Sequence, residues 1–146
     1  MKSSTASKKT NFEFPVDLAT IQRAREIIAP HIIRTQLEQS INASRMAGYD
    51  LFLKFENRQR TGSFKIRGAA NKLTSLTSAQ KKNGVIAFSA GNHAQGVACM
   101  AQKLGIKAVI VMPLASPLVK VSATKAFGAE VHLHGSVVDE SYQYML

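Results

Sequence analysis

The stretch "GVIAFSAGNHAQGVACMAQKLGIKAVIVM", residues 84–112, places a longer amphipathic segment between two short apolar ones. Each apolar segment opens on a glycine and is rich in aliphatic, largely β-branched residues, which is typical of buried strands. The apolar residues between them follow the i, i+3, i+4, i+7 spacing of a helix: Val97, Met100, Ala101 and Leu104. Gly105 suits the position just after the C-terminus of that helix. The pattern predicts a strand–helix–strand unit with parallel strands.

The same unit continues along the chain. A third glycine-led segment, "GAEVHLH", begins at residue 128, and the three opening glycines are 21 and 23 residues apart. This period fits one strand, one helix and two short connections, so we predict an α/β fold whose parallel sheet has both faces covered. We expect earlier helices in residues 16–30, 40–48 and 63–76 and a strand in 50–56. Residues 136–146 resemble the start of one more helix, which suggests that the chain is part of a longer polypeptide.

The composition narrows the class of protein. The 146 residues are 45% hydrophobic, and 19 basic against 9 acidic residues give a net charge of +10. We interpret residues 1–13, polar and containing Lys2, Lys8 and Lys9, as a disordered leader. The single cysteine, Cys99, excludes a disulfide within the chain, and we expect a buried structural thiol in a protein of the reducing cytoplasm. We expect no membrane span, and no metal site either, because His132 and His134 have no third ligand close in sequence.

Lys65 lies in "TGSFKIRGAANKL", residues 61–73. The predicted helix packs through Ile66, Ala69, Ala70 and Leu73, which leaves Lys65 outside this stripe on the first turn. A neutral lysine amine forms Schiff bases, and we expect Arg67 and the helix N-terminus to disfavour the charged form. These residues alone leave open a solvated surface lysine.

The segment "SAGNHAQG", residues 89–96, follows a predicted strand and opens the next helix. Open α/β sheets bind ligands at this end of their strands, and a helix N-terminus attracts anions such as carboxylate or phosphate. We expect Asn92 to cap the helix, with Gln95 reaching back in a capping box. His93 is a possible base or metal ligand, although a packing role is more common for such a histidine.

Together, "ENRQRTGSFKIRGAANKL" and "FSAGNHAQGVA" resemble the fold-type II pyridoxal-phosphate enzymes, and most closely their threonine/serine dehydratase (threonine ammonia-lyase) branch. The resemblance also includes "MPLASPLVKVSATKAFGAEVHLHG" and extends from residue 16 to about residue 142. It implies the parallel-sheet architecture of the tryptophan-synthase-beta-like enzymes. It divides the chain into the leader, residues 1–13, and the amino-terminal part of a catalytic region, residues 14–146, whose small α/β domain covers about residues 50–146.

The resemblance also implies roles for individual residues. Pyridoxal 5′-phosphate would be the cofactor, and Lys65 would be its Schiff-base lysine and the base that moves the substrate Cα proton. Phe64 would pack beside the cofactor ring, and Asn92 would donate a hydrogen bond to the pyridoxal 3′-oxygen. The loop that holds the substrate carboxylate would consist of Ser89, Ala90, Gly91, Asn92 and His93. The implied reaction converts L-threonine or L-serine to a 2-oxo acid and ammonia, in a protein that forms homo-oligomers when complete.

Three alternatives stay open. Serine racemases of this family carry a serine at position 90; Ala90 cannot move a proton, which favours elimination over racemisation. The family's glycine-rich phosphate loop is absent from these 146 residues, so the chain could be an inactive fragment or an accessory domain that binds an amino acid or an acidic partner. The positive charge could bind nucleic acid through a cluster of Arg58, Arg60, Lys65 and Arg67. Few aromatic residues accompany this cluster, so we expect no nucleic-acid partner. The "TQLE" of residues 35–38 departs from the family's Thr-Pro-Leu, with only a local effect expected.

Overall fold

The computed structural model describes residues 16–146, so the predicted leader, residues 1–13, lies outside the described part. Its centre is a three-stranded parallel sheet in the order β3-β4-β5. The strands are β3 (Val85–Phe88), β4 (Ala108–Met112) and β5 (Glu130–Leu133). Val85 pairs with Ala108, and Val109 pairs with Glu130. The three predicted parallel strands are confirmed, each within its glycine-led segment.

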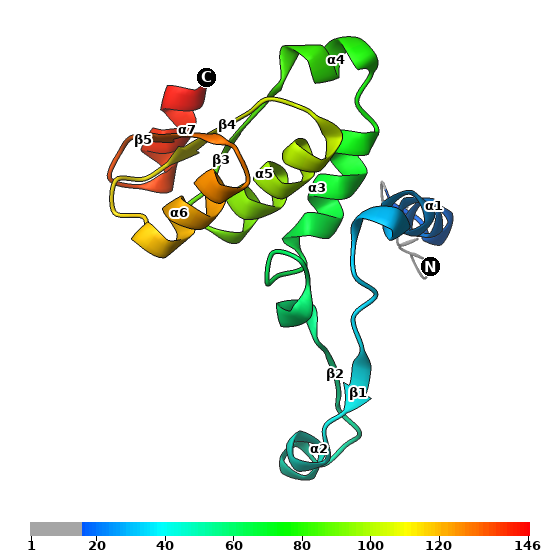
Figure 1. Ribbon diagram of the computed structural model, residues 1–146. Helices are drawn as coiled ribbons and strands as arrows, with labels where there is room; N and C mark the ends of the chain where they lie inside the picture. The colour runs from blue at the N-terminus through cyan, green and yellow to red at the C-terminus, as the bar shows by residue number, and fades with distance from the viewer. Residues whose placement is uncertain (1–15) are drawn as a thin grey trace, which may run out of the picture.

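Helices cover both faces of this sheet (Figure 1). The crossover helices are α5 (Asn92–Leu104) and α6 (Leu118–Ala126), and α3 (Lys65–Thr74) packs against α5. The last helix, α7 (Val138–Met145), contacts β3 and β4. Along β3, Val85 and Ala87 pack against the main core, whereas the Phe88 ring lies 4.9 Å from the Tyr142 ring of α7. Because alternate residues of a strand point to opposite faces, α7 covers the face opposite α5.

The core forms where α5 packs between α3 and the sheet. The predicted stripe of α3 is confirmed: Ile66, Ala69, Ala70 and Leu73 are all buried. The predicted face of α5 is buried through Val97, Met100 and Ala101, with Leu104 half-buried. Gly105 ends α5 in the left-handed conformation at φ 66°, as expected for a C-terminal glycine.

The amino-terminal part of the described chain is an arm that leads away from the sheet and returns (Figure 1). It begins with α1 (Leu18–Ile28) and the 3-10 turn η1 (Ala29–His31), and α1 packs against α3. An antiparallel pair, β1 (Leu37–Gln39) and β2 (Phe52–Lys54), follows, with α2 (Ile41–Ala47) at its tip. A second 3-10 turn, η2 (Glu56–Arg58), leads back to α3.

Two elements were not predicted. One is β1, which is three residues long and exposed throughout. The other is α4 (Ser78–Asn83), a short helix whose Thr77 and Gln80 form a reciprocal capping box. No helix between residues 16 and 146 combines the length and the apolar character needed to cross a membrane.

Candidate active site around Lys65

Lys65 is the first residue of α3, and its side chain is exposed. Its Nζ lies 5.1 Å from the centroid of the Phe64 ring, which is itself 57% exposed. None of the ion pairs within residues 16–146 involves Lys65. The amine is therefore accessible from solvent and lies next to an exposed aromatic ring. Both features would allow a planar ligand to reach it.

A close approach of α5 to α3 brings the two sequence motifs together. A Cβ atom at Gly96 would lie 3.2 Å from the Ile66 amide nitrogen and 3.2 Å from the Lys65 carbonyl carbon. A side chain at position 96 would be packed more tightly than most, so glycine favours this close approach of the helices. Although His93 is exposed as a whole, surrounding protein shields its ring and lowers its pKa, and the charge of Lys65 lowers the pKa further. Both effects favour the neutral form of the His93 ring.

The loop of residues 89–93 follows β3 at the carboxyl edge of the sheet. Ser89 donates its backbone N–H to Val111 O at 3.0 Å, and its hydroxyl accepts a hydrogen bond from the Gly91 N–H at 3.2 Å. The predicted capping box is wrong: α5 begins at Asn92, Gly91 occupies the cap position, and no side chain caps the helix. Because Asn92 is the first helical residue, its amide cannot turn back onto the helix and stays exposed instead.

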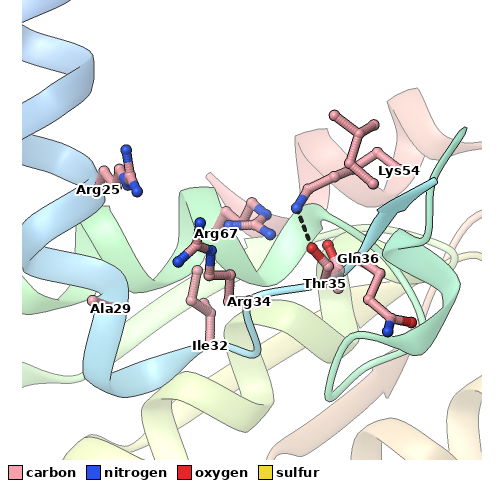
Figure 2. Close-up of a pocket in the computed structure, with 9 residues that line it drawn as sticks. Arg25, Ala29, Ile32, Arg34, Thr35, Gln36, Lys54 and Arg67 are labelled. Atoms are coloured by element: carbon pink, nitrogen blue, oxygen red, sulfur yellow. Dashed lines mark hydrogen bonds between the residues drawn. The ribbon is translucent and has the colours of Figure 1, made fainter. Parts of the chain in front are cut away.

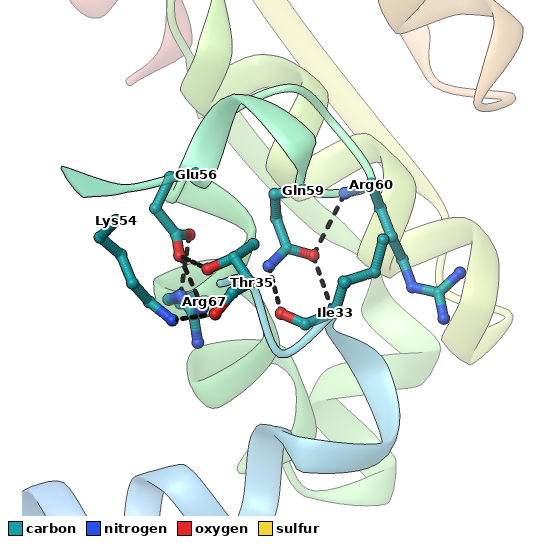
Figure 3. A network of polar contacts seen from close by, with 7 residues as sticks. All are labelled: Ile33, Thr35, Lys54, Glu56, Gln59, Arg60 and Arg67. Carbon is teal, nitrogen blue, oxygen red and sulfur yellow. Dashed lines mark hydrogen bonds and ion pairs between the residues drawn. The ribbon is translucent and has the colours of Figure 1, made fainter. Parts of the chain in front are cut away.

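Arg67 does not act on Lys65 in the predicted way. Arg67 Nη2 and Nε donate to the two oxygens of Glu56 at 2.7 and 2.9 Å, so its charge is neutralised (Figure 3). Positions i and i+2 of a helix also point to different sides. The hydrogen bond from Arg67 holds the pKa of Glu56 at about 2, with further help from the Thr35 hydroxyl, against a partial opposing effect of burial.

The loop before Lys65 is anchored by Gln59, which the sequence did not single out. Gln59 is buried, and its side chain exchanges two hydrogen bonds of 2.8 Å with the backbone N–H and C=O of Ile33 (Figure 3). Its oxygen also accepts from the Arg60 N–H at 3.1 Å. Polar residues in a loop usually indicate contact with solvent, and the backbone partner of Gln59 lies 26 residues away, so the sequence carries no signal of this role.

Two hydroxyls beside Lys65 lack partners. Thr61 and Ser63 are each 8% exposed, and within the described residues neither hydroxyl has a hydrogen-bond partner. A buried hydroxyl without a partner costs free energy and is uncommon, so a polar ligand near the start of α3 is one way to satisfy such groups.

A separate cavity lies between α1, residues 32–37, β2 and α3 (Figure 2). Its volume is about 820 Å³, and four basic residues line it: Arg25, Arg34, Lys54 and Arg67. Two of these are already engaged, since Lys54 donates to Thr35 O at 2.6 Å and Arg67 pairs with Glu56. Neither Lys65 nor the loop of residues 89–93 lines this cavity.

The basic cluster considered for nucleic acid is partly neutralised. Arg58 donates to Gln36 at 3.1 Å and lies over the Phe55 ring at 5.0 Å, while Arg67 is paired with Glu56. Two of its four charges are thus committed to contacts within the chain.

The remaining candidates have structural roles in the described part of the chain. Cys99 is half-buried, and burial raises the pKa of its thiol, as expected for a structural cysteine. His132 contacts Glu130 at 2.7 Å, and His134 stacks on Tyr144 at 4.1 Å between ring centroids. Among residues 16–146 no group of three potential ligands is arranged to hold a metal ion.

Comparison with known proteins extends over most of the chain. Residues 28–146 match the model of the pyridoxal-phosphate dependent enzyme family. The chain is 47% identical over 131 residues to the L-threonine ammonia-lyase of Thermotoga maritima, covering 90% of this chain and 33% of the relative. It is 51% identical over 124 residues to the catabolic L-threonine dehydratase TdcB of Escherichia coli, covering 85% and 38%. Among solved structures, maize serine racemase superposes with a TM-score of 0.85 at 36% identity, covering 90% of this chain and 40% of that one. The chain thus spans about a third of the length of the curated relatives it matches.

Proposed function

Because this chain belongs to the family of pyridoxal-phosphate-dependent enzymes, fold type II, we propose that it is the amino-terminal part, residues 14–146, of a threonine dehydratase. The reaction would convert L-threonine to 2-oxobutanoate and ammonia, and L-serine to the corresponding 2-oxo acid. The observation that supports this proposal is the close packing of α3 against α5, where the Lys65 backbone lies beside Gly96 and the Lys65 charge acts on His93 of the loop.

The residues present fit the family's cofactor. An accessible primary amine at Lys65, an exposed Phe64 ring and the unpartnered hydroxyls of Thr61 and Ser63 form a donor set suited to an aldehyde-bearing aromatic anion. Bound pyridoxal phosphate supplies an electron sink for the electron pair left when the substrate Cα loses its proton. In our proposal Lys65 holds the cofactor, Phe64 packs beside its ring and Asn92 donates to its 3′-oxygen.

The chain's own residues would then bind the substrate and move its protons. The loop Ser89–His93 orients the carboxylate, since the first N–H groups of α5 have no acceptor within the helix. The Lys65 amine would take the Cα proton on its side of the substrate. The β-hydroxyl would leave as water, and hydrolysis of the resulting enamine would consume one water and release ammonia.

The second candidate is a serine racemase, which the likeness to the maize enzyme favours. Racemisation needs an acid on the face opposite Lys65. Position 90 carries alanine, which has no proton to give. Elimination is therefore the better proposal for this chain.

The test is to incubate the chain with pyridoxal phosphate, reduce it with borohydride and map the modified peptide. We expect the label on Lys65 and its loss in Lys65→Ala. Lys72, on the same helix and also exposed, serves as the matched control, because Lys72→Ala should keep the label. Equal labelling of several surface lysines would contradict the proposal. If the chain carries the label but releases no 2-oxo acid, it binds the cofactor without completing the reaction.

A further inference from the structure

Lys120, in the first turn of α6, lies against the loop that we propose to hold the substrate carboxylate. A Cβ atom at Gly91 would lie 2.9 Å from Lys120 Nζ and 3.1 Å from its Cδ. The end of the lysine side chain therefore occupies the space that a side chain at position 91 would need. Gly91 itself is buried, and Lys120 is half-buried.

The Lys120 ammonium has no carboxylate partner in the described part of the chain. The ion pairs there join Glu56 to Arg67 and Glu130 to Lys107 and His132. The nearest helix end adds more positive potential, because α5 starts directly after Gly91 and no side chain caps it.

The loop is thus placed between two ammonium groups. Lys65 lies on its α3 side, close enough to lower the pKa of His93, and Lys120 lies on its α6 side. In the proposed reaction Lys65 is occupied by the cofactor and by proton transfer. This leaves Lys120 as the cation beside the loop that is not used in the chemistry.

We propose that Lys120 is a further substrate-binding residue, whose ammonium selects amino acids by their carboxylate on the Ser89–His93 loop. This inference rests on the proposed function, since it assigns a ligand to the same loop. A positive charge beside backbone N–H groups favours a compact anion and contributes nothing to an uncharged analogue. An alanine at position 91 would shift the end of the Lys120 side chain.

The experiment is a titration followed by the amide NMR shifts of residues 89–92 at low ionic strength, where charge interactions are least screened. The probes are L-threonine, L-threoninol, which lacks the carboxylate, and inorganic phosphate. We expect Lys120→Gln to weaken L-threonine binding by about two- to fivefold, as for a partly exposed ion pair. Lys120→Arg should restore it, and Lys120→Gln should not weaken the binding of L-threoninol, which carries an ammonium but no carboxylate.

Lys125→Gln is the matched control, because Lys125 is exposed at the other end of α6. It should bind L-threonine like the wild type. Gly91→Ala should weaken binding in the same direction as Lys120→Gln. An unchanged amide spectrum outside the loop verifies that each variant is folded.

The proposal is overturned if the wild type shows no carboxylate-dependent shifts, or if Lys120→Gln binds L-threonine as the wild type does. A larger effect of Lys120→Gln on phosphate than on L-threonine would also overturn the carboxylate assignment. Labelling of Lys65 separates the two proposals. A labelled Lys65 with no effect of Lys120 refutes only the present inference, and an unlabelled Lys65 with a clear effect refutes only the proposed cofactor chemistry.

Discussion

The sheet region and the amino-terminal arm are stabilised by different kinds of contact. In the sheet region the contacts are apolar, and residues such as Ile66, Met100 and Ile110 are fully buried. In the arm the large apolar side chains are mostly exposed, among them Leu37, Ile41, Met46 and Phe52. Polar contacts of Gln59, Glu56 and Lys54 join the two chain segments of the arm to each other. The arm is joined to the rest by the Glu56–Arg67 ion pair and by the buried Ile28 of α1.

This difference shows which contacts fix the position of the Lys65 amine. Burial of apolar surface is non-directional and fixes helices only to within their packing tolerance. Hydrogen bonds to a buried side chain fix atoms to a few tenths of an ångström. The residues before Lys65 belong to the polar region and Lys65 itself opens a core helix, so both kinds of contact determine where its amine lies.

The largest expected effect comes from removing core volume. Ile110→Ala should lower the free energy of unfolding by about 2–5 kcal/mol, because Ile110 is 0% exposed and the cavity left behind cannot be refilled by neighbours. Urea unfolding followed by circular dichroism measures the change. Ile86→Ala is the matched control on the neighbouring strand; Ile86 is 51% exposed, and its loss should cost about 0.5 kcal/mol or less.

Equal losses for the two variants would show that the described sheet is not the stabilising centre. The claim that apolar burial stabilises the sheet region more than the arm would then be contradicted.

The next effect concerns the ion pair at the base of the arm. Glu56→Gln should cost on the order of 2 kcal/mol at neutral pH, because it leaves the partly buried Arg67 without its carboxylate. The folded-state pKa of Glu56 is about 2, below its ordinary value of 4.5. Its contribution is therefore fully present above about pH 4.5 and is lost as the pH falls toward 2.

The measurement is the difference in unfolding free energy between wild type and Glu56→Gln at pH 6 and at pH 2.5. We expect this difference to shrink at the lower pH. Glu38→Gln, at an exposed position of β1, should show no such trend. A difference that stays constant with pH would mean that the Glu56 carboxylate contributes no more than a neutral amide.

Sequence alone was sufficient for the sheet region. Three glycine-led apolar segments, the spacing between them and one amphipathic segment predicted β3, β4, β5 and the crossover helices, because burial imposes a periodicity that the residues carry. The resemblance found the family, and the family match confirms it. The roles of Phe64, Lys65, Asn92 and the loop residues stay predictions, although the charge of Lys65 is near enough to lower the pKa of His93.

The parts that were missed depend on partners distant in sequence. The capping box failed because α5 starts one residue earlier than the pattern suggested, so Gly91 and not Asn92 takes the cap position. Arg67 was interpreted from its distance to Lys65 along the chain, whereas its partner is Glu56, eleven residues away. No periodicity marks such a pair, nor a lysine such as Lys120 that reaches a loop from another helix.

The smallest expected effect tests the arm most directly. Gln59→Leu keeps a buried side chain of similar size but removes the acceptor of the Ile33 and Arg60 N–H groups. Because leucine restores apolar burial and loses only the hydrogen bonds, the cost should be about 1–2 kcal/mol. Gln102→Leu, at an exposed position of α5, is the matched control and should be close to neutral.

Hydrogen exchange gives this prediction its local readout. The amides of Ile33 and Arg60 should exchange faster in Gln59→Leu, whereas the amides of β4 should exchange as in the wild type. Uniformly faster exchange, β4 included, would mean that arm and sheet unfold as one unit. In that case Gln59 would stabilise the whole fold. Its contact with Ile33 would then not act locally on the position of the loop before Lys65.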